Sequence, residues 1–136
     1  DDFAQFSIAF PKSWNEGTIT YQPFWTVTGT NAGTVIWLMS GVAIQNDATI
    51  NLAFALEDEA DATVRPVATT ALAHSTTSND LMVSAESGAL KIKGSPTVDD
   101  VSFFQINLDT SASGQTGAVR LLGIKIFFTT DAKNDA

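Results

Sequence analysis

Residues 34–45 read TVIWLMSGVAIQ, and this stretch decides the fold. It begins with five consecutive large apolar residues, 35–39. A strand with one wet face alternates apolar and polar residues, so a continuous run rich in β-branched and aromatic residues predicts a strand buried on both faces. Ser40 and Gly41 interrupt the run well short of the roughly 20 apolar residues that a membrane span requires. We therefore expect a central strand of a sheet, with Trp37 in the core.

The composition describes one acidic, weakly charged domain. The chain has 136 residues, no cysteine and a net charge of −8, from 15 acidic and 7 basic residues. This length suits a single domain over 1–136, and the acidic balance disfavours a nucleic-acid partner. Only 16% of the residues are charged, where a typical domain has roughly 25%. Thr, Ser, Asn and Gln, or another subunit, must therefore cover the surface.

Alternating segments predict further strands on either side of the central run. The alternation of apolar and polar residues is clearest in 3–10, 18–28, 101–108 and 118–129. Pro23 lies inside the second of these, which predicts an edge position or a β-bulge there. Short strands with frequent turn signals and no βαβ alternation indicate an all-β fold, an antiparallel β-sandwich, with the jelly roll as one form it can take.

Two details of the chain are predicted less directly. Asn46 and Asp47 can cap a short helix, and Ile50 and Phe54 stand four residues apart, so we expect at most one short helix near residues 47–55. Residues 81–93 read as two short strands joined by a hairpin turn.

Few residues offer chemistry. The single histidine, His74, has no recognisable nucleophile motif around it, and we interpret it as an exposed loop residue. No pair of acids stands out as a catalytic acid and base, so we predict a protein that is not an enzyme, with no catalytic residue and no cofactor. Calcium is the one ion for which the chain offers candidate oxygen ligands. These lie in two acidic clusters, Glu57, Asp58, Glu59 and Asp61, and Asp99 with Asp100.

Trp14 is the one tryptophan that the pattern leaves open for a ligand. It stands in a predicted turn, whereas Trp25 and Trp37 stand in predicted core strands. An aromatic face at the end of a sandwich can stack on a sugar, and a large apolar side chain in a turn can equally cover the edge of the core. Trp14 is therefore a candidate glycan contact, with packing over the core as the alternative.

Several segments resemble a group of structural proteins of tailed bacteriophages, from marine and environmental phages and prophages. The resemblance extends over nearly the whole chain and consists of structural signatures. The segments are 10–18 (FPKSWNEGT), the strand with Trp25, 35–37 (VIW), 41–43 (GVA), 47–48 (DA), 79–83 (NDLMV), 94–96 (GSP), 103–105 (FFQ), 120–124 (RLLGI) and 128–132 (FTTDA). The chain departs from the group at 105–108 and in the loop 111–117.

The resemblance implies a virion component, a fibre, spike or capsid-surface decoration domain at the C-terminal end of a longer chain. It implies a location on the phage particle surface and other virion proteins as partners. The alternative hypothesis, from a different class, is a carbohydrate-binding or receptor-binding module that contacts glycans of the host surface. Exposed aromatic residues at one end of the sandwich would favour that alternative.

Two phenylalanines indicate self-assembly. The runs 35–39 and 124–128 are apolar on both faces, whereas a sheet of an isolated sandwich has one inner face. Phe103 and Phe127 therefore need a second cover, which a symmetric partner subunit can supply because obligate interfaces are apolar. Since fibres and capsid decorations are commonly trimeric, we expect a homotrimer with these two residues at the subunit interface.

Overall fold

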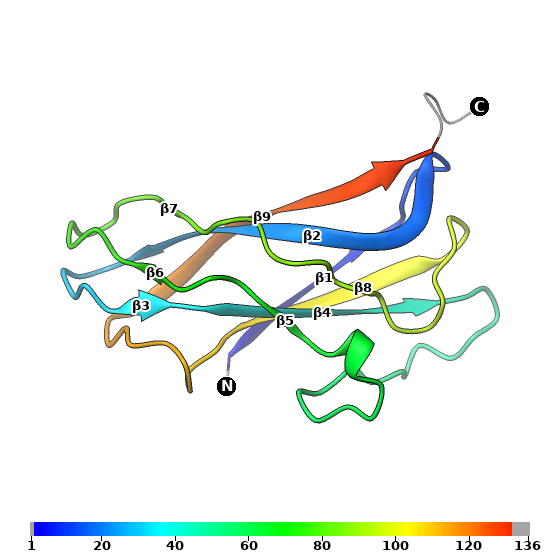
Figure 1. Ribbon diagram of the computed structural model, residues 1–136, viewed down its shortest axis with the longest axis horizontal. Coiled ribbons are helices and arrows are strands. Elements are labelled where there is room, and N and C mark those ends of the chain that lie inside the picture. The colour runs from blue at the N-terminus through cyan, green and yellow to red at the C-terminus, as the bar shows by residue number, and fades with distance from the viewer. Residues whose placement is uncertain (1, 132–136) are drawn as a thin grey trace.

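The computed structural model describes residues 2–131 and has an all-β architecture, which confirms the predicted antiparallel β-sandwich (Figure 1). One sheet has the strand order β1-β8-β4-β5, a second has β7-β2-β9, and β3 pairs with β6. Every pairing between these strands is antiparallel. The strands are β1 Phe3–Ile8, β2 Trp14–Val27, β3 Thr34–Val35, β4 Trp37–Ile44, β5 Val67–Ala68, β6 Leu72–Ala73, β7 Met82–Val83, β8 Val101–Leu108 and β9 Val119–Thr130.

The core lies between the β1-β8-β4-β5 sheet and the β7-β2-β9 sheet and is rich in aromatic rings. Phe104 stacks on Phe6 with ring centroids 5.2 Å apart. Gly41 is paired with Phe104 across the sheet, and a Cβ at this glycine would lie 2.7 Å from the Phe104 ring. The glycine in the central run therefore makes room for the ring opposite. The buried members of the core include Trp25, Trp37, Met39, Leu90 and Ile106.

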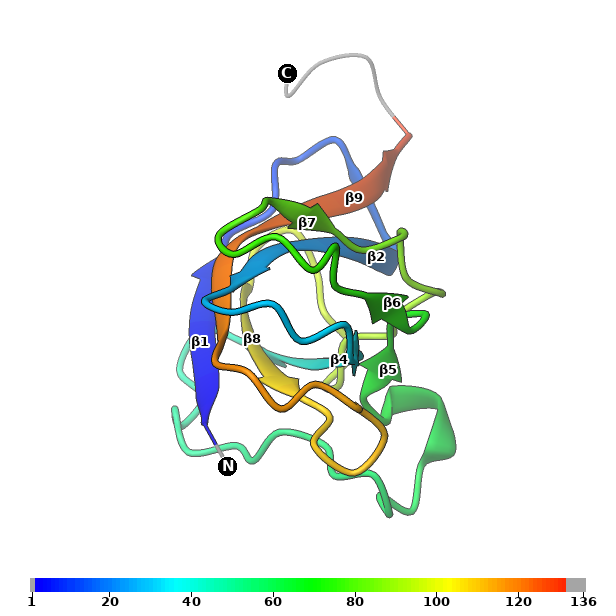
Figure 2. The same cartoon turned by 90° about the vertical axis from the view of Figure 1, so that its left-hand side faces the viewer.

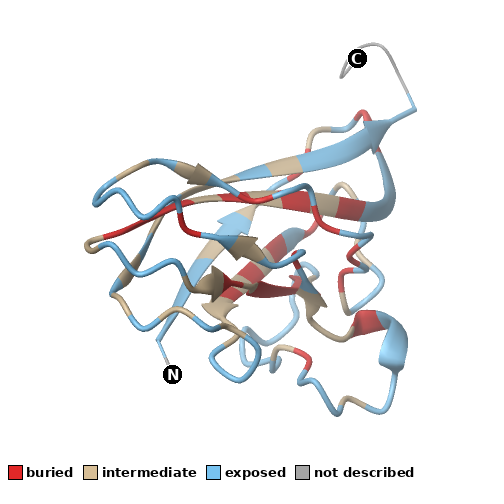
Figure 3. Ribbon diagram, turned by 60° about the vertical axis from the view of Figure 1, so that its left-hand side comes forward, coloured by how far each residue is buried: buried red, intermediate tan, exposed pale blue. Residues whose placement is uncertain are grey.

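The predicted central strand is confirmed. In β4 every residue from Trp37 to Ala43 is buried, and β4 lies between β8 and β5 (Figure 3). Met39 belongs to the core, whereas Leu38 and Val42 alternate with the core residues and so face the other side of the sheet. The segment between β4 and β5 runs across that outer side (Figure 2). The chain itself thus covers the second face of β4, and this strand does not need a partner subunit.

Tyr21 connects the two sheets. Its ring is fully buried on β2, and its hydroxyl donates to the carbonyl oxygen of Val67 in β5, at 2.5 Å. The carbonyl oxygen of Trp37 lies 3.1 Å away and also accepts from the backbone N–H of Thr69. Burial raises the pKa of the Tyr21 phenol well above its ordinary value.

A β-bulge in β9 changes which side chains face the core. Phe24 of β2 pairs with Gly123, but the next residue, Trp25, pairs with Leu121, so Leu122 is an extra residue. Leu121 packs against the core, and Leu122 is 58% exposed. The bulge next to Pro23 confirms that prediction. Because of the bulge, β9 exposes part of one of the two apolar faces that its sequence shows.

Two local features that the sequence suggested do not form. Residues 47–55 form no helix: Asp47 has φ 64°, and Ile50 is 75% exposed, so no apolar helix face would be buried there. Within the described residues the helical structure is one short 3₁₀ turn, Ala62–Val64.

The predicted hairpin over 81–93 does not form either. The backbone of Leu90 exchanges two hydrogen bonds with Ile19 of β2, and Lys93 bonds with Gly41 and Ala43 of β4. This segment therefore crosses from one sheet to the other, and the predicted turn joins no pair of strands.

Candidate functional site

Trp14 does not present a face for a ligand. It begins β2, is 1% exposed, and stacks on Phe10 with ring centroids 4.3 Å apart. Phe10 in turn meets Phe128 edge to face at 5.5 Å. The ring closes the end of the core and offers no exposed face, and a glycan contact at Trp14 stays a prediction. The alternative interpretation, that Trp14 packs over the edge of the core, describes what it does.

His74 is buried, so its interpretation as an exposed loop residue was wrong. It is 3% exposed, and its Nδ1 lies 3.1 Å from the carbonyl oxygen of Asn31. A carbonyl only accepts, so Nδ1 carries the proton in this contact. Nε2 has no hydrogen-bond partner among the described residues, and the Trp25 ring lies beside the imidazole, with centroids 6.3 Å apart. His74 is part of the packing that surrounds Trp25.

The acidic residues of the two predicted clusters make separate contacts and do not converge on one point. Glu59 pairs with Lys93 at 3.2 Å, and Asp61 accepts hydrogen bonds from the Thr63 backbone and hydroxyl, which hold the pKa of Asp61 below its usual range. Asp100 is buried and accepts from the backbone N–H of Thr97 at 2.7 Å. Within residues 2–131, no three His, Asp or Glu side chains are grouped as a metal site. Calcium binding stays a prediction that a calcium titration tests.

The structure places Phe103 and Phe127 on opposite sides of the sandwich. Phe104 and Ile106 point into the core from β8, so Phe103, which directly precedes Phe104, lies on the outer face of the β1-β8-β4-β5 sheet. Phe127 pairs with Thr20 and lies on the outer face of the β7-β2-β9 sheet. The two residues therefore cannot lie in one patch of a single copy.

The surroundings of the two phenylalanines also differ. Phe103 is half-buried and lines a hollow of about 330 Å³ together with Ile44, Ala48 and Ile50. The chain itself thus provides part of the cover for Phe103. Phe127 is 36% exposed. Phe127 is the better candidate for a subunit contact.

The outer face of the β7-β2-β9 sheet combines apolar side chains with cations, and we call it the β9 face. Lys125 Nζ lies 5.9 Å from the ring centroid of Phe24 and 5.8 Å from that of Phe127. A cation above aromatic rings is stabilised by their quadrupoles, by about 0.5–1 kcal/mol at an exposed site. The β9 face is defined by Phe24, Val83, Arg120, Leu122, Lys125 and Phe127, of which Val83 is 41% exposed.

Sequence reasoning found only Phe127 of this surface. Alternation alone would put Leu122 on the same strand side as Ile124 and Ile126, because a bulge cannot be seen in it. The role of Lys125 could not be predicted from the sequence, because its position near two rings depends on the β2–β9 register. The signal that was available is the excess of basic over acidic residues in 118–130, within a chain of net charge −8.

A groove of about 620 Å³ opens at the side of the sandwich, where β1 and β9 form the edges of different sheets. Its walls come from the start of β1, the end of β8 and the start of β9, and Trp37 and Ile106 reach it from the core. The indole N–H of Trp37 has no acceptor among the described residues. The groove is lined mainly by apolar side chains, and its lining contains no pair of titratable residues.

The chain was compared with protein-family models, with curated proteins and with solved structures, and none of them matches it. In the part of the chain that the structure describes, no helix has the length and apolar character to cross a membrane.

Proposed function

We propose that this domain is a non-enzymatic structural component of a phage virion, a fibre, spike or capsid-surface decoration domain that assembles as a homotrimer. The observation that carries the proposal is the β9 face. A domain whose core is closed at the end by Trp14 and across β4 by its own chain still leaves Leu122 58% and Phe127 36% exposed on one sheet. Contiguous exposed apolar side chains mark an interaction site more often than a free surface.

The shape of the fold supports an assembly role. The strands β2 and β9 are 14 and 12 residues long and pair over most of their length, with register shifts between Trp14 and Ile19 and between Phe24 and Trp25, so the β9 face is extended. Interface cores are typically aromatic with few charges, and a polar rim surrounds them. Phe24, Leu122 and Phe127 supply the apolar side chains of the face, Lys125 lies close to both the Phe24 and the Phe127 ring, and Arg120 adds a second cation.

The second candidate function, glycan binding, depended on an exposed Trp14, and Trp14 is buried in this structure. The resemblance to tailed-phage structural proteins and the sandwich architecture support the structural role, and no separate observation favours a glycan site.

Two measurements test the proposal. Native mass spectrometry at micromolar concentration is expected to give three chain masses, and a spectrum of monomer alone would overturn the trimer. Electron microscopy of intact particles with a gold-labelled antibody against this domain is expected to label the particle surface. Particles that carry the polypeptide by mass spectrometry but never show surface label would refute the decoration or fibre role.

A further inference from the structure

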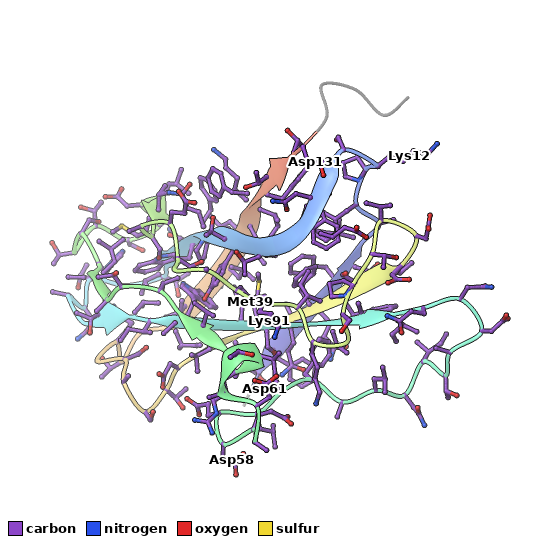
Figure 4. The ribbon with its side chains drawn as sticks, turned by 45° about the vertical axis from the view of Figure 1, so that its right-hand side comes forward. Lys12, Met39, Asp58, Asp61, Lys91 and Asp131 are labelled. Atoms are coloured by element: carbon purple, nitrogen blue, oxygen red, sulfur yellow. The ribbon has the colours of Figure 1, made fainter. Side chains whose placement is uncertain are left out.

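A second surface of the molecule combines apolar side chains with negative charge. Ile50 is 75% exposed, Leu52 48% and Leu56 66%, in the segment that crosses the outer side of the β1-β8-β4-β5 sheet. Glu57 and Asp58 follow directly, and neither has an ion pair or a hydrogen bond within the described chain. Figure 4 shows Asp58 at the tip, pointing away from the body of the molecule. We call residues 50–58 the acidic segment.

The β9 face has the matching character with the opposite charge. Arg120 and Lys125 have no carboxylate partner among residues 2–131. The chain has seven basic residues, and two of them lie on this face. Glu86 reaches the same side of the sheet, where its carboxylate accepts from the hydroxyl of Thr20, the residue that pairs with Phe127. The cations in the middle of the face are thus free to meet carboxylates from outside.

We infer that the β9 face of one copy binds the acidic segment of a second copy. Leu122 and Phe127 would bury the exposed leucines of the segment, and apolar burial supplies the main driving force of such contacts. Arg120 and Lys125 would meet Glu57 and Asp58, and complementary charges fix the orientation and exclude wrong pairings. The inference rests on the proposed assembly role and names the two surfaces that carry it.

The position of the two surfaces makes the contact intermolecular. The β9 face lies on one outer side of the sandwich and the acidic segment on the other, in both ribbon views (Figures 1 and 2). A chain cannot bring its own segment to its own β9 face, so the contact is head to tail between copies. Such heterologous contacts close into rings when the rotation at each contact allows it, and otherwise give open chains.

Charge reversal tests the contact. The face variant is R120E/K125E, and the segment variant is E57K/D58K; all four side chains are exposed or outside the core. The matched controls are K12E/K91E and D2K/D131K, which change the net charge equally at exposed residues outside both surfaces. Sedimentation equilibrium measures self-association of each variant, and circular dichroism checks that each is folded.

Each surface variant is expected to self-associate at least about tenfold more weakly than the wild type, while the controls stay within about threefold. An equimolar mixture of the two surface variants should recover association, because each copy then offers one intact surface and one reversed surface to the other. Failure of the mixture to associate, or controls as weak as the surface variants, would overturn the inference.

The same experiment separates this contact from the trimer. A trimer that persists in both surface variants supports the proposed assembly and overturns the assigned surfaces. A ladder of masses that is abolished by both variants and restored in the mixture supports the contact and overturns the closed trimer. A monomer at all concentrations in the wild type overturns both.

Discussion

Removal of the Tyr21 hydroxyl is expected to destabilise the sandwich by an amount that depends on pH. At neutral pH the variant Y21F keeps the ring and loses the hydrogen bond that crosses between the sheets to Val67. The carbonyl of Trp37 keeps its bond from the Thr69 N–H, and the carbonyl of Val67 loses the hydroxyl as a donor. We expect a loss of about 1–2 kcal/mol in the free energy of unfolding, the range for a buried hydrogen bond whose acceptor stays behind.

At alkaline pH the difference should shrink, and the sign follows from the direction of the pKa shift. Burial raises the pKa of Tyr21 in the folded state above its unfolded value of about 10. The stability that the neutral phenol contributes is therefore complete below pH 10 and is lost as the pH rises above it. At pH 11 the wild type should have lost about 1.4 kcal/mol through this group, whereas Y21F has no such group to ionise. The two proteins should then have nearly equal stability.

Two assays check this reasoning. Urea unfolding of both proteins from pH 7 to pH 11 gives the difference in free energy. Absorbance at alkaline pH reports phenolate formation, and Tyr21 is the single tyrosine of the chain, so the signal belongs to one group. We expect phenolate to appear only with unfolding. A titration near pH 10 in a protein that remains folded, or a Y21F variant as stable as the wild type at pH 7, would refute the burial and the bond between the sheets.

Three further substitutions have expected outcomes. G41A should cost about 1–3 kcal/mol in urea unfolding, because the added Cβ would lie 2.7 Å from the fully buried Phe104 ring; no change would mean that the ring is free to move. L38A should cost about 2–4 kcal/mol, because Leu38 is 7% exposed beneath the chain's own segment; a cost within about 0.5 kcal/mol would place Leu38 at the surface. F127S should cost under about 1 kcal/mol in the dilute monomer yet abolish the trimer mass in native mass spectrometry; an unchanged mass would remove Phe127 from the contact.

The sequence predicted the class of the fold because its strongest signals are local. The alternation in Val101–Leu108 and the continuous apolar run in Trp37–Ile44 each correspond to one strand of the structure. The bulge near Pro23 was also predictable, since proline lacks the N–H that a regular ladder requires.

The features that failed depend on contacts between distant segments. Residues 47–55 had the spacing of a helix, but Ile50 is 75% exposed, so a helix there would bury little of its apolar face. His74 and Trp14 are buried because strands far apart in the sequence close over them, which no local pattern records. The bulge at Leu122 breaks the alternation within β9, so a count of alternating residues does not show which side Leu122 faces.

The proposed self-assembly accordingly depends on one sheet face and not on two apolar strands. The apolar outer face of β4 is sealed by the chain itself, and the two apolar faces of β9 arise in part from the bulge. What remains is the direct observation of exposed apolar side chains around Lys125 on the β9 face.

Hydroxyl-radical footprinting of the β9 face, followed over a range of protein concentrations, tests the central claim most directly. If copies cover this face, Leu122 and Phe127 of the wild type will become protected from oxidation as the concentration rises. In the variant R120E/K125E the same two side chains will stay reactive at all concentrations. Equal oxidation of both side chains at every concentration, at the level that their exposure in a single chain implies, would contradict the claim.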